Sequence, residues 1–438
     1  MKTYYIKTLG CKVNRYESDG IATDLEKNGF KKAKAIKDAN VCIINTCTVT
    51  SKAGMQSRQA IRKIANDNPN AKIIVTGCHA QIEPEKIKLI NNVDFIVDHK
   101  NKFKISNSLI SNTFINQSNE ESQFNKCTDS IFRSFKHLVT GEMTRAYLKI
   151  QDGCNAYCTY CIIPYARGKS RSMPEDEVIA NLKSLYSKGF NEAVLTGIHI
   201  GAWGLDFQTK SNFSKLLSRI IKTKDLPRIR ISSIEPRELT DNIIDFTKNT
   251  AKLCDHFHIP LQSGDDEILK KMKRPYDTKY FKQLIININK KIPDASIGID
   301  VIAGFPGETD QNFENTYSFI ENLQIAYLHV FPYSPRKGTK AYDFQNKVNT
   351  KKIKDRCAML RKLSQIKKKN FEKSMLDKTL KAVIQTKNDK RTNMLKGITS
   401  NYLSILIKND QDIKGKIVDI IPKKWDENNV LHGIIKSI

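Results

Sequence analysis

Short apolar runs alternate with helix-forming segments through most of this chain, a rhythm that is typical of α/β proteins. In the first hundred residues the apolar runs lie at 3–9, 41–46, 71–77 and 94–98, with helical patterns between them, the first at about 16–28. Continuous apolar strands joined by helices are typical of a parallel sheet that is buried on both faces. The sequence therefore predicts an N-terminal doubly wound parallel sheet.

A second alternating array follows and predicts a partial barrel. Its candidate strands, with helical patterns between them, lie at 145–150, 192–197, 228–233, 255–259, 297–303 and 326–331. Six strand–helix units with right-handed crossovers curl into an open barrel, two units short of the closed eightfold form. A long basic helix is expected at about 350–373, and the short strand-like runs after it predict a small antiparallel β-barrel.

These patterns divide the chain into four predicted parts. Residues 1–100 form the first sheet domain, and 101–139, rich in Asn and Ser with little periodicity, form a linker. Residues 140–373 form the barrel domain, and 374–438 form the small C-terminal barrel.

Charge indicates a polyanionic partner. The 438 residues include 73 Lys and Arg against 46 Asp and Glu, a net charge of +27. Lysine-rich coding in an AT-rich genome is the alternative explanation. There is no apolar run of 18 residues and no apolar core of a signal peptide at the N-terminus, so we expect a cytoplasmic protein without a membrane span.

Three cysteines stand together in the stretch CNAYCTYC, at positions 154, 158 and 161. Thiolates select zinc, copper(I) or iron–sulfur clusters, but a structural zinc site needs four ligands and no second cysteine pair follows nearby. A four-iron cluster held by three cysteines keeps one iron open to a small molecule. A zinc knuckle or a chance cluster is the alternative.

Three further cysteines each follow one of the first three predicted strands. Cys11 comes after KTLG, Cys47 after IINT and Cys78 after IVTG. Because the carboxyl ends of parallel strands share one edge of the sheet, we expect these thiols to converge there and to hold a second cluster with an open iron. Cys42 lies within its strand and is assigned to the core, and three others are interpreted as structural or incidental: Cys127, Cys254 and Cys357.

The stretch CNAYCTYC, with Tyr160 before its last cysteine, resembles the signature of radical-SAM enzymes. Together with the three spaced cysteines it resembles the methylthiotransferase family, which combines an N-terminal three-cysteine domain, a radical-SAM barrel and a C-terminal RNA-binding barrel called TRAM. The stretch TLGCKVNRYESDG (8–20) resembles the branch that acts on N6-threonylcarbamoyladenosine in tRNA.

The resemblance implies a transferase that inserts a methylthio group at carbon 2 of adenosine 37, with two [4Fe-4S] clusters and S-adenosylmethionine as cofactors. Cys154, Cys158 and Cys161 would ligate the radical-generating cluster, and the three spaced cysteines would ligate the sulfur-delivering one. No general acid or base is assigned. Strand-end loops of the barrel supply the other expected cofactor contacts, which with Tyr160 are Gly197, Glu235, Gln262 and Asp300. Three histidines beside them are interpreted as structural: His199, His258 and His329.

The implied partners are the tRNA anticodon stem-loop, an electron donor and a sulfur source, and the chain is expected to act as a monomer. A basic cluster in the C-terminal barrel is the candidate phosphate contact, with a merely solvated basic face as the alternative: Lys378, Lys381, Lys387, Lys390 and Arg391. Rival functions are methylthiolation of isopentenyladenosine 37 or of a ribosomal-protein aspartate. A rival from another class is a non-catalytic iron–sulfur sensor that binds RNA.

Overall fold

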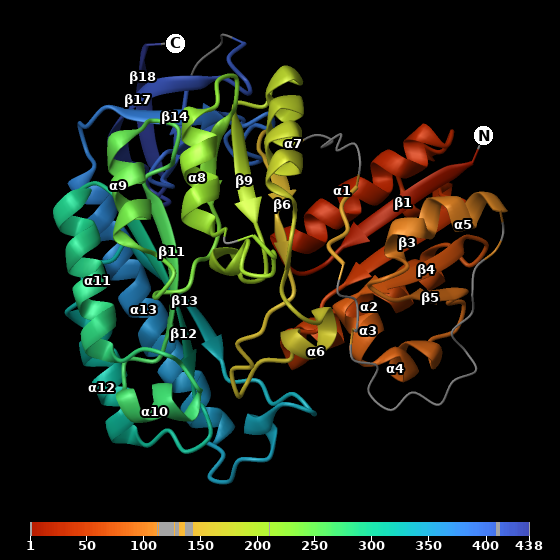
Figure 1. The fold of residues 1–438 in the computed structure, drawn as a ribbon, viewed down its shortest axis with the longest axis horizontal. Coiled ribbons are helices and arrows are strands. Elements are labelled where there is room, and N and C mark those ends of the chain that lie inside the picture. Colours follow the sequence, from red (N-terminus) through yellow and green to blue (C-terminus); the bar gives the residue numbers. More distant parts are fainter. Residues whose placement is uncertain are drawn as a thin grey trace. The chain divides into compact units, whose positions relative to one another are not determined.

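The computed structural model describes residues 2–111, 113, 127, 131–135, 143–209, 211–408 and 412–437. The chain forms two compact units, and each is described by itself. Unit 1 contains Met1–Gly141, Lys149–Met173 and Ser334–Tyr342, and unit 2 contains Glu142–Leu148, Pro174–Tyr333 and Asp343–Ile438. Figure 1 traces the elements of both units along the chain.

Unit 1 is built on a five-stranded parallel sheet with the order β2-β1-β3-β4-β5. Ile43 and Ile44 on the central strand β3 are both fully buried, so both faces of the sheet are covered, as predicted. This is the flavodoxin-like strand order, in which the direction of winding reverses between β1 and β3. The strands are β1 (Thr3–Thr8), β2 (Lys31–Lys32), β3 (Val41–Thr46), β4 (Lys72–Gly77) and β5 (Phe95–Val97).

The helices of unit 1 start closer to the cysteines than the sequence predicts. Helix α1 begins at Lys12, directly after Cys11, and α3 begins at Cys78 itself. The predicted linker at 101–139 opens with helix α5, and much of its remainder lies outside the described residues. The helices are α1 (Lys12–Lys27), α2 (Ser51–Asp67), α3 (Cys78–Ile82), α4 (Pro84–Lys88), α5 (Ile105–Ser111) and α6 (Ile163–Arg167).

The partial barrel consists of two three-stranded sheets, β10-β9-β6 and β11-β12-β13. A parallel bridge between Ser233 and His258 continues β10 into β11, so six strands follow one another as predicted. Figure 1 shows these strands with the helices of unit 2. The strands are β6 (Ala146–Lys149), β9 (Glu192–Thr196), β10 (Arg228–Ile231), β11 (His256–Gln262), β12 (Ser296–Ala303) and β13 (Tyr327–Pro332).

Several barrel helices begin at a side-chain cap. Asn212, Asp265 and Thr309 each accept a hydrogen bond from a backbone N–H of the first turn, which satisfies one of the donors exposed there. Among the described residues no helix has the length and apolar character needed to cross a bilayer. The helices are α7 (Glu175–Ser187), α8 (Phe213–Lys222), α9 (Asp241–Asn249), α10 (Asp266–Lys271), α11 (Thr278–Lys291), α12 (Asp310–Glu321) and α13 (Thr350–Ser374).

The end of the chain closes into the predicted small barrel, with the strand order β14-β15-β16-β18-β17. Its pairings are antiparallel except for β16 with β18, which run parallel and close the ring. Arg230 of β10 donates hydrogen bonds to the carbonyls of Thr399 and Ser400, which ties this barrel to the larger one within unit 2. The strands are β14 (Leu380–Ile384), β15 (Leu395–Thr399), β16 (Ser404–Ile407), β17 (Ile417–Trp425) and β18 (Leu431–Ser437).

Candidate functional site

The three spaced cysteines stand at the carboxyl ends of adjacent strands. Cys11 follows β1, Cys47 follows β3 and Cys78 follows β4, and these strands are neighbours in the sheet. The first two flank the point where the winding reverses, which is where doubly wound sheets bind their ligands. Parallel topology therefore brings together thiols that are up to 67 positions apart in the sequence.

Glycine lets the chain pass close to one of these cysteines. Gly10 has φ +97°, and a Cβ at this position would lie 2.7 Å from Cys47 Cβ and 3.0 Å from its Sγ. Real Cβ atoms do not approach so closely, and the positive φ also disfavours other residues. Glycine at position 10, directly before Cys11, thus leaves the room that the Cys47 side chain needs.

The three thiols also act on one another electrostatically. Burial raises the pKa of Cys47, and a charge on Cys11 adds to that rise. Burial likewise raises the pKa of Cys78 to about 12, opposed by the Arg167 guanidinium and reinforced by Cys47 and Cys11. The Arg167 cation therefore favours the thiolate forms of Cys47 and Cys78, which are the forms that ligate metal.

The CNAYCTYC loop lies between strand β7 (Gln151–Asp152) and helix α6. Strand β8 (Arg171–Ser172) follows α6 and pairs antiparallel with β7. The Cys154 N–H donates to the Gly168 carbonyl at 3.0 Å, and the Cys161 N–H donates to the Cys158 carbonyl at 3.0 Å. Backbone hydrogen bonds thus fix the path of the loop, and the Ala156 N–H donates to Cys154 Sγ at 3.4 Å.

The two cysteine sets belong to the same compact unit, and their surroundings are continuous. Cys78 packs in one apolar cluster with Ile82, Ile162 and Ala166. Ile162 directly follows Cys161, so the residue after the last loop cysteine lies in the same apolar cluster as the last of the spaced cysteines. None of the ten cysteines of the chain forms a disulfide.

A buried ion-pair network joins the two sets, and the sequence analysis did not identify it. Arg167, at the end of α6, donates to Glu17 at 2.9 Å, to Asp152 at 3.0 Å and to Asn14 at 2.7 Å. Burial would raise the pKa of Glu17, but Arg167, Lys102 and Lys149 outweigh it and hold the pKa well below its usual range. The signal lay in the stretches GCKVNRYE and PYARG, where polar residues flank the cysteines.

Gly197, Glu235 and Gln262 lie at or after the ends of barrel strands, whereas Asp300 lies inside β12 and not in the strand-end loop where the sequence analysis expected it. Gly197 directly follows β9, and Gln262 ends β11 at a bulge with φ +69°. Glu235, after β10, pairs with Arg274, while burial raises the pKa of the Glu235 carboxyl. These three residues and Asp300 belong to unit 2, whereas Tyr160 belongs to unit 1. Their contact with the cofactor stays a prediction.

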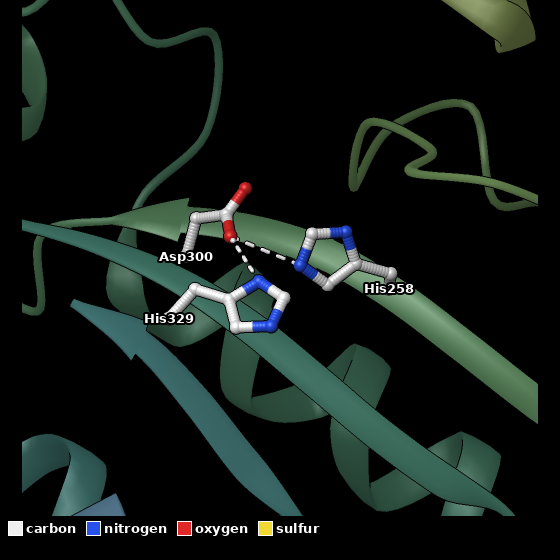
Figure 2. A group of neighbouring side chains, drawn as sticks. All are labelled: His258, Asp300 and His329. Carbon is white, nitrogen blue, oxygen red and sulfur yellow. Dashed lines mark hydrogen bonds and ion pairs between the residues drawn. The ribbon is translucent and has the colours of Figure 1, made fainter. Parts of the chain in front are cut away.

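Asp300 is bonded to two of the histidines interpreted as structural (Figure 2). One carboxylate oxygen lies 2.9 Å from His258 Nε2 and 3.3 Å from His329 Nδ1, and the three come from β11, β12 and β13. Burial alone would raise the pKa of Asp300, but these hydrogen bonds hold it well below its usual range. Two imidazoles and a carboxylate with donor atoms within 4.8 Å of one another also suit a divalent metal ion.

The predicted basic cluster of the C-terminal barrel is divided in two. Lys378 pairs with Asp294 at 2.6 Å and Lys381 pairs with Asp419 at 3.0 Å, so acidic partners offset both charges. The remaining three lie exposed between β14 and β15, and they are Lys387, Lys390 and Arg391. Their contact with RNA stays a prediction.

The donor chemistry fits the iron–sulfur clusters that the sequence implies. Each set offers three cysteine sulfurs outside any disulfide, and soft thiolates are the ligands that hold such clusters. The buried Arg167 acts electrostatically on the spaced set, Cys11, Cys47 and Cys78. A guanidinium there offsets part of the negative charge that a thiolate-bound cluster carries.

Comparison with known proteins bears directly on these sites. Residues 3–98 match the family described as Uncharacterized protein family UPF0004, and residues 148–320 match the Radical SAM superfamily. A solved structure of TsrM, a radical S-adenosylmethionine methyltransferase from Kitasatospora setae, has a TM-score of 0.55 at 14% identity. That match covers 78% of this chain and 75% of TsrM, and it supports the fold.

Relatives of known name match almost the whole chain. Threonylcarbamoyladenosine tRNA methylthiotransferase MtaB of Bacillus subtilis is 38% identical, over 96% of this chain and 93% of the relative. The protein of the same name from Rickettsia prowazekii is 37% identical, over 95% of this chain and 94% of the relative. The tRNA-2-methylthio-N(6)-dimethylallyladenosine synthase of Clostridium tetani is 32% identical, over 95% and 93%. The chain therefore belongs to the radical-SAM tRNA methylthiotransferases, transferase enzymes that work with S-adenosylmethionine and two [4Fe-4S] clusters.

Proposed function

We propose that this enzyme inserts a methylthio group at carbon 2 of N6-threonylcarbamoyladenosine 37 in tRNA. The observation that carries the proposal is the presence of two three-cysteine sets within one compact unit, with Cys78 and the residue after Cys161 in one apolar cluster. The relatives from Bacillus subtilis and Rickettsia prowazekii, named for this nucleoside, support the choice of substrate.

Cys154, Cys158 and Cys161 would hold the cluster that binds S-adenosylmethionine, and Cys11, Cys47 and Cys78 would hold the second cluster. When bound, the first cluster and its cofactor supply a carbon radical, and the second supplies a site for sulfur. Such chemistry suits carbon 2 of adenosine, because its C–H bond is neither acidic nor nucleophilic and a side-chain base would not activate it.

The protein's own groups position these ligands. Arg167 bonds Asn14 and Glu17, on the helix that follows Cys11, and also Asp152, which precedes the three-cysteine loop. This network fixes the two sulfur sets relative to each other. Groups of the barrel strands and of the loops after them would orient the cofactor, namely Gly197, Glu235, Gln262 and Asp300, with Tyr160 added from the cysteine loop.

The small C-terminal barrel is proposed to be a TRAM domain that binds the anticodon stem-loop through backbone phosphates. Position 37 lies in a single-stranded loop, where a base can be splayed out for chemistry. We further propose a cytoplasmic monomer that takes electrons from a separate donor and sulfur from a separate source.

The test is the nucleoside content of tRNA. Mass spectrometry of tRNA from a deletion strain should show loss of the methylthio form of threonylcarbamoyladenosine, and the wild-type gene should restore it. A variant with Cys154, Cys158 and Cys161 all replaced by alanine should not restore it. If the deletion leaves this nucleoside unchanged, the proposed substrate is wrong. Loss of methylthio-isopentenyladenosine instead would favour the activity for which the Clostridium tetani relative is named.

A further inference from the structure

A pocket of about 450 Å³ opens in unit 1 beside the spaced cysteines. Its walls come from the start of α2, from the turn between α3 and α4, and from the segment around Arg336. Its volume is in the range of about 300–1,000 Å³ that is usual for small-molecule sites. No residue that the sequence analysis assigned to a cofactor or to RNA lines this pocket.

Two residues that line the pocket contact the chain neighbours of two proposed cluster ligands. Thr48 follows Cys47, and its hydroxyl accepts a hydrogen bond from Arg336 Nη2 at 2.6 Å. His79 follows Cys78, and its Nε2 lies 3.4 Å from Arg58 Nη1. Two of the arginines that line the pocket are thus anchored on the residues adjoining the cysteines.

The charge balance of the pocket favours an anion. Four cations line it, Arg58, Lys86, Arg336 and Lys337, against two carboxylates. One of these carboxylates, Glu83, is already occupied, because it pairs with His79, Lys86 and Arg336. The other, Glu85, pairs with Lys88.

Two of the four cations have no acidic partner among the residues that the structure describes. Within the described part of the chain, Arg58 contacts the His79 ring but no carboxylate, and Lys337 is exposed and forms no ion pair. Arg336 is 7% exposed, and its Nε has no hydrogen-bond acceptor among the described residues. Unpaired guanidinium and ammonium groups around a cavity are the features that recognise a carboxylate or a phosphate.

We propose that this pocket receives the carboxylate of the threonylcarbamoyl group of the substrate. This rests on the proposed function, since it needs adenosine 37 to approach the second cysteine set. The threonylcarbamoyl group carries one carboxylate and one hydroxyl, whereas an isopentenyl group carries no polar atom. A pocket with unpaired donors binds the carboxylate of the threonylcarbamoyl group. An isopentenyl group would leave these donors without acceptors, so the pocket selects between the two nucleosides.

The experiment measures binding of anticodon stem-loops to the full chain with both clusters loaded, under anaerobic conditions. The stem-loops carry threonylcarbamoyladenosine, its neutral methyl ester or unmodified adenosine at position 37. The wild-type protein should bind the free acid most tightly. Arg58→Gln and Lys337→Gln should each weaken binding of the free acid by about tenfold and leave the other two ligands unchanged. Lys340→Gln, in the same segment but outside the pocket, is the matched control and should have no effect.

Two results would overturn the inference. Equal loss for all three stem-loops would show that the pocket binds a phosphate of the RNA backbone, and unchanged binding of the free acid would show that the pocket binds neither anion. Because Lys337 is exposed, its replacement does not threaten folding. The proposed function fails separately, if the wild-type enzyme forms no methylthio product from the threonylcarbamoylated RNA.

Discussion

The Arg167 guanidinium lies 2.9 Å from the Glu17 carboxylate, and both side chains are almost fully buried. Arg167 ends the helix after the three-cysteine loop, and Glu17 lies on the helix that follows Cys11. One ion pair thus joins the two motifs that the chemistry requires. Its partners are 150 positions apart in the sequence.

Arg167→Met should strongly destabilise the protein. Removing one partner of a buried pair leaves Glu17 and Asp152 without their main cation, which costs about 3–5 kcal/mol. Urea unfolding of the full chain measures the loss. The control is Arg219→Gln, which removes a half-exposed arginine paired with Glu175 and Asp176 and should leave the midpoint almost unchanged. Similar midpoints for the two variants would contradict a structural role for Arg167.

Replacing Cys11, Cys47 and Cys78 together with alanine should separate the two chemistries. We expect the iron content after anaerobic reconstitution to fall from about eight to about four per chain, with loss of methylthio product but not of S-adenosylmethionine cleavage. Cys42→Ala, in the core of β3, is the control and should keep all the iron. If cleavage also disappears from a protein that still holds four irons, the division of roles between the two sets is wrong.

Gly10→Ala should disturb the second cluster specifically. The new methyl group would meet Cys47 Cβ at 2.7 Å, and the backbone has φ +97°. Gly29→Ala imposes a similar strain at φ +81° but meets nothing within 4 Å. Iron analysis should therefore show loss of iron from the Gly10→Ala variant and no loss from the Gly29→Ala variant. Equal losses would assign the effect to backbone strain rather than to the approach of Cys47.

Glu192 should make unit 2 sensitive to acid. Burial would raise its pKa, but Arg230 and Arg228 outweigh that and lower it from 4.5 to about 2. A depressed pKa means that the ionised carboxylate stabilises the fold above pH 4.5, by roughly 3 kcal/mol, and that this contribution is lost as the pH falls towards 2. Glu192→Gln should be less stable at pH 7, and its difference from wild type in urea unfolding should shrink on acidification. A pH-independent difference would exclude this linkage.

The exposed and the paired cations of the C-terminal barrel should contribute differently to RNA binding. Lys390→Gln with Arg391→Gln should weaken tRNA binding and lower the slope of log K against log salt by roughly 0.7–0.9 per lost phosphate contact. Lys378→Gln with Lys381→Gln should change the slope less, because Asp294 and Asp419 already offset those charges. Filter binding across a salt series measures both. Equal slopes for the two double variants would favour a merely solvated basic face.

The amino-acid sequence by itself determined the positions of the six cysteines that we propose as cluster ligands, and the layers of the fold. Apolar runs of strand length followed by cysteine predict ligands at one sheet edge, because parallel strands all end on the same side. The apolar runs and the cysteines that follow them are local patterns, so they can be read from a single sequence.

Only the tertiary structure decided which charges meet. Contacts between distant segments decide that Arg167 pairs with Glu17 and Glu235 with Arg274, and that Lys337 meets no acidic partner among the described residues. Helix α5 within the predicted linker was missed for the same reason, since its burial against unit 1 compensates for weak periodicity. Tertiary packing decides which partner a polar residue meets, whereas the amino-acid sequence alone decides that the residue follows a strand.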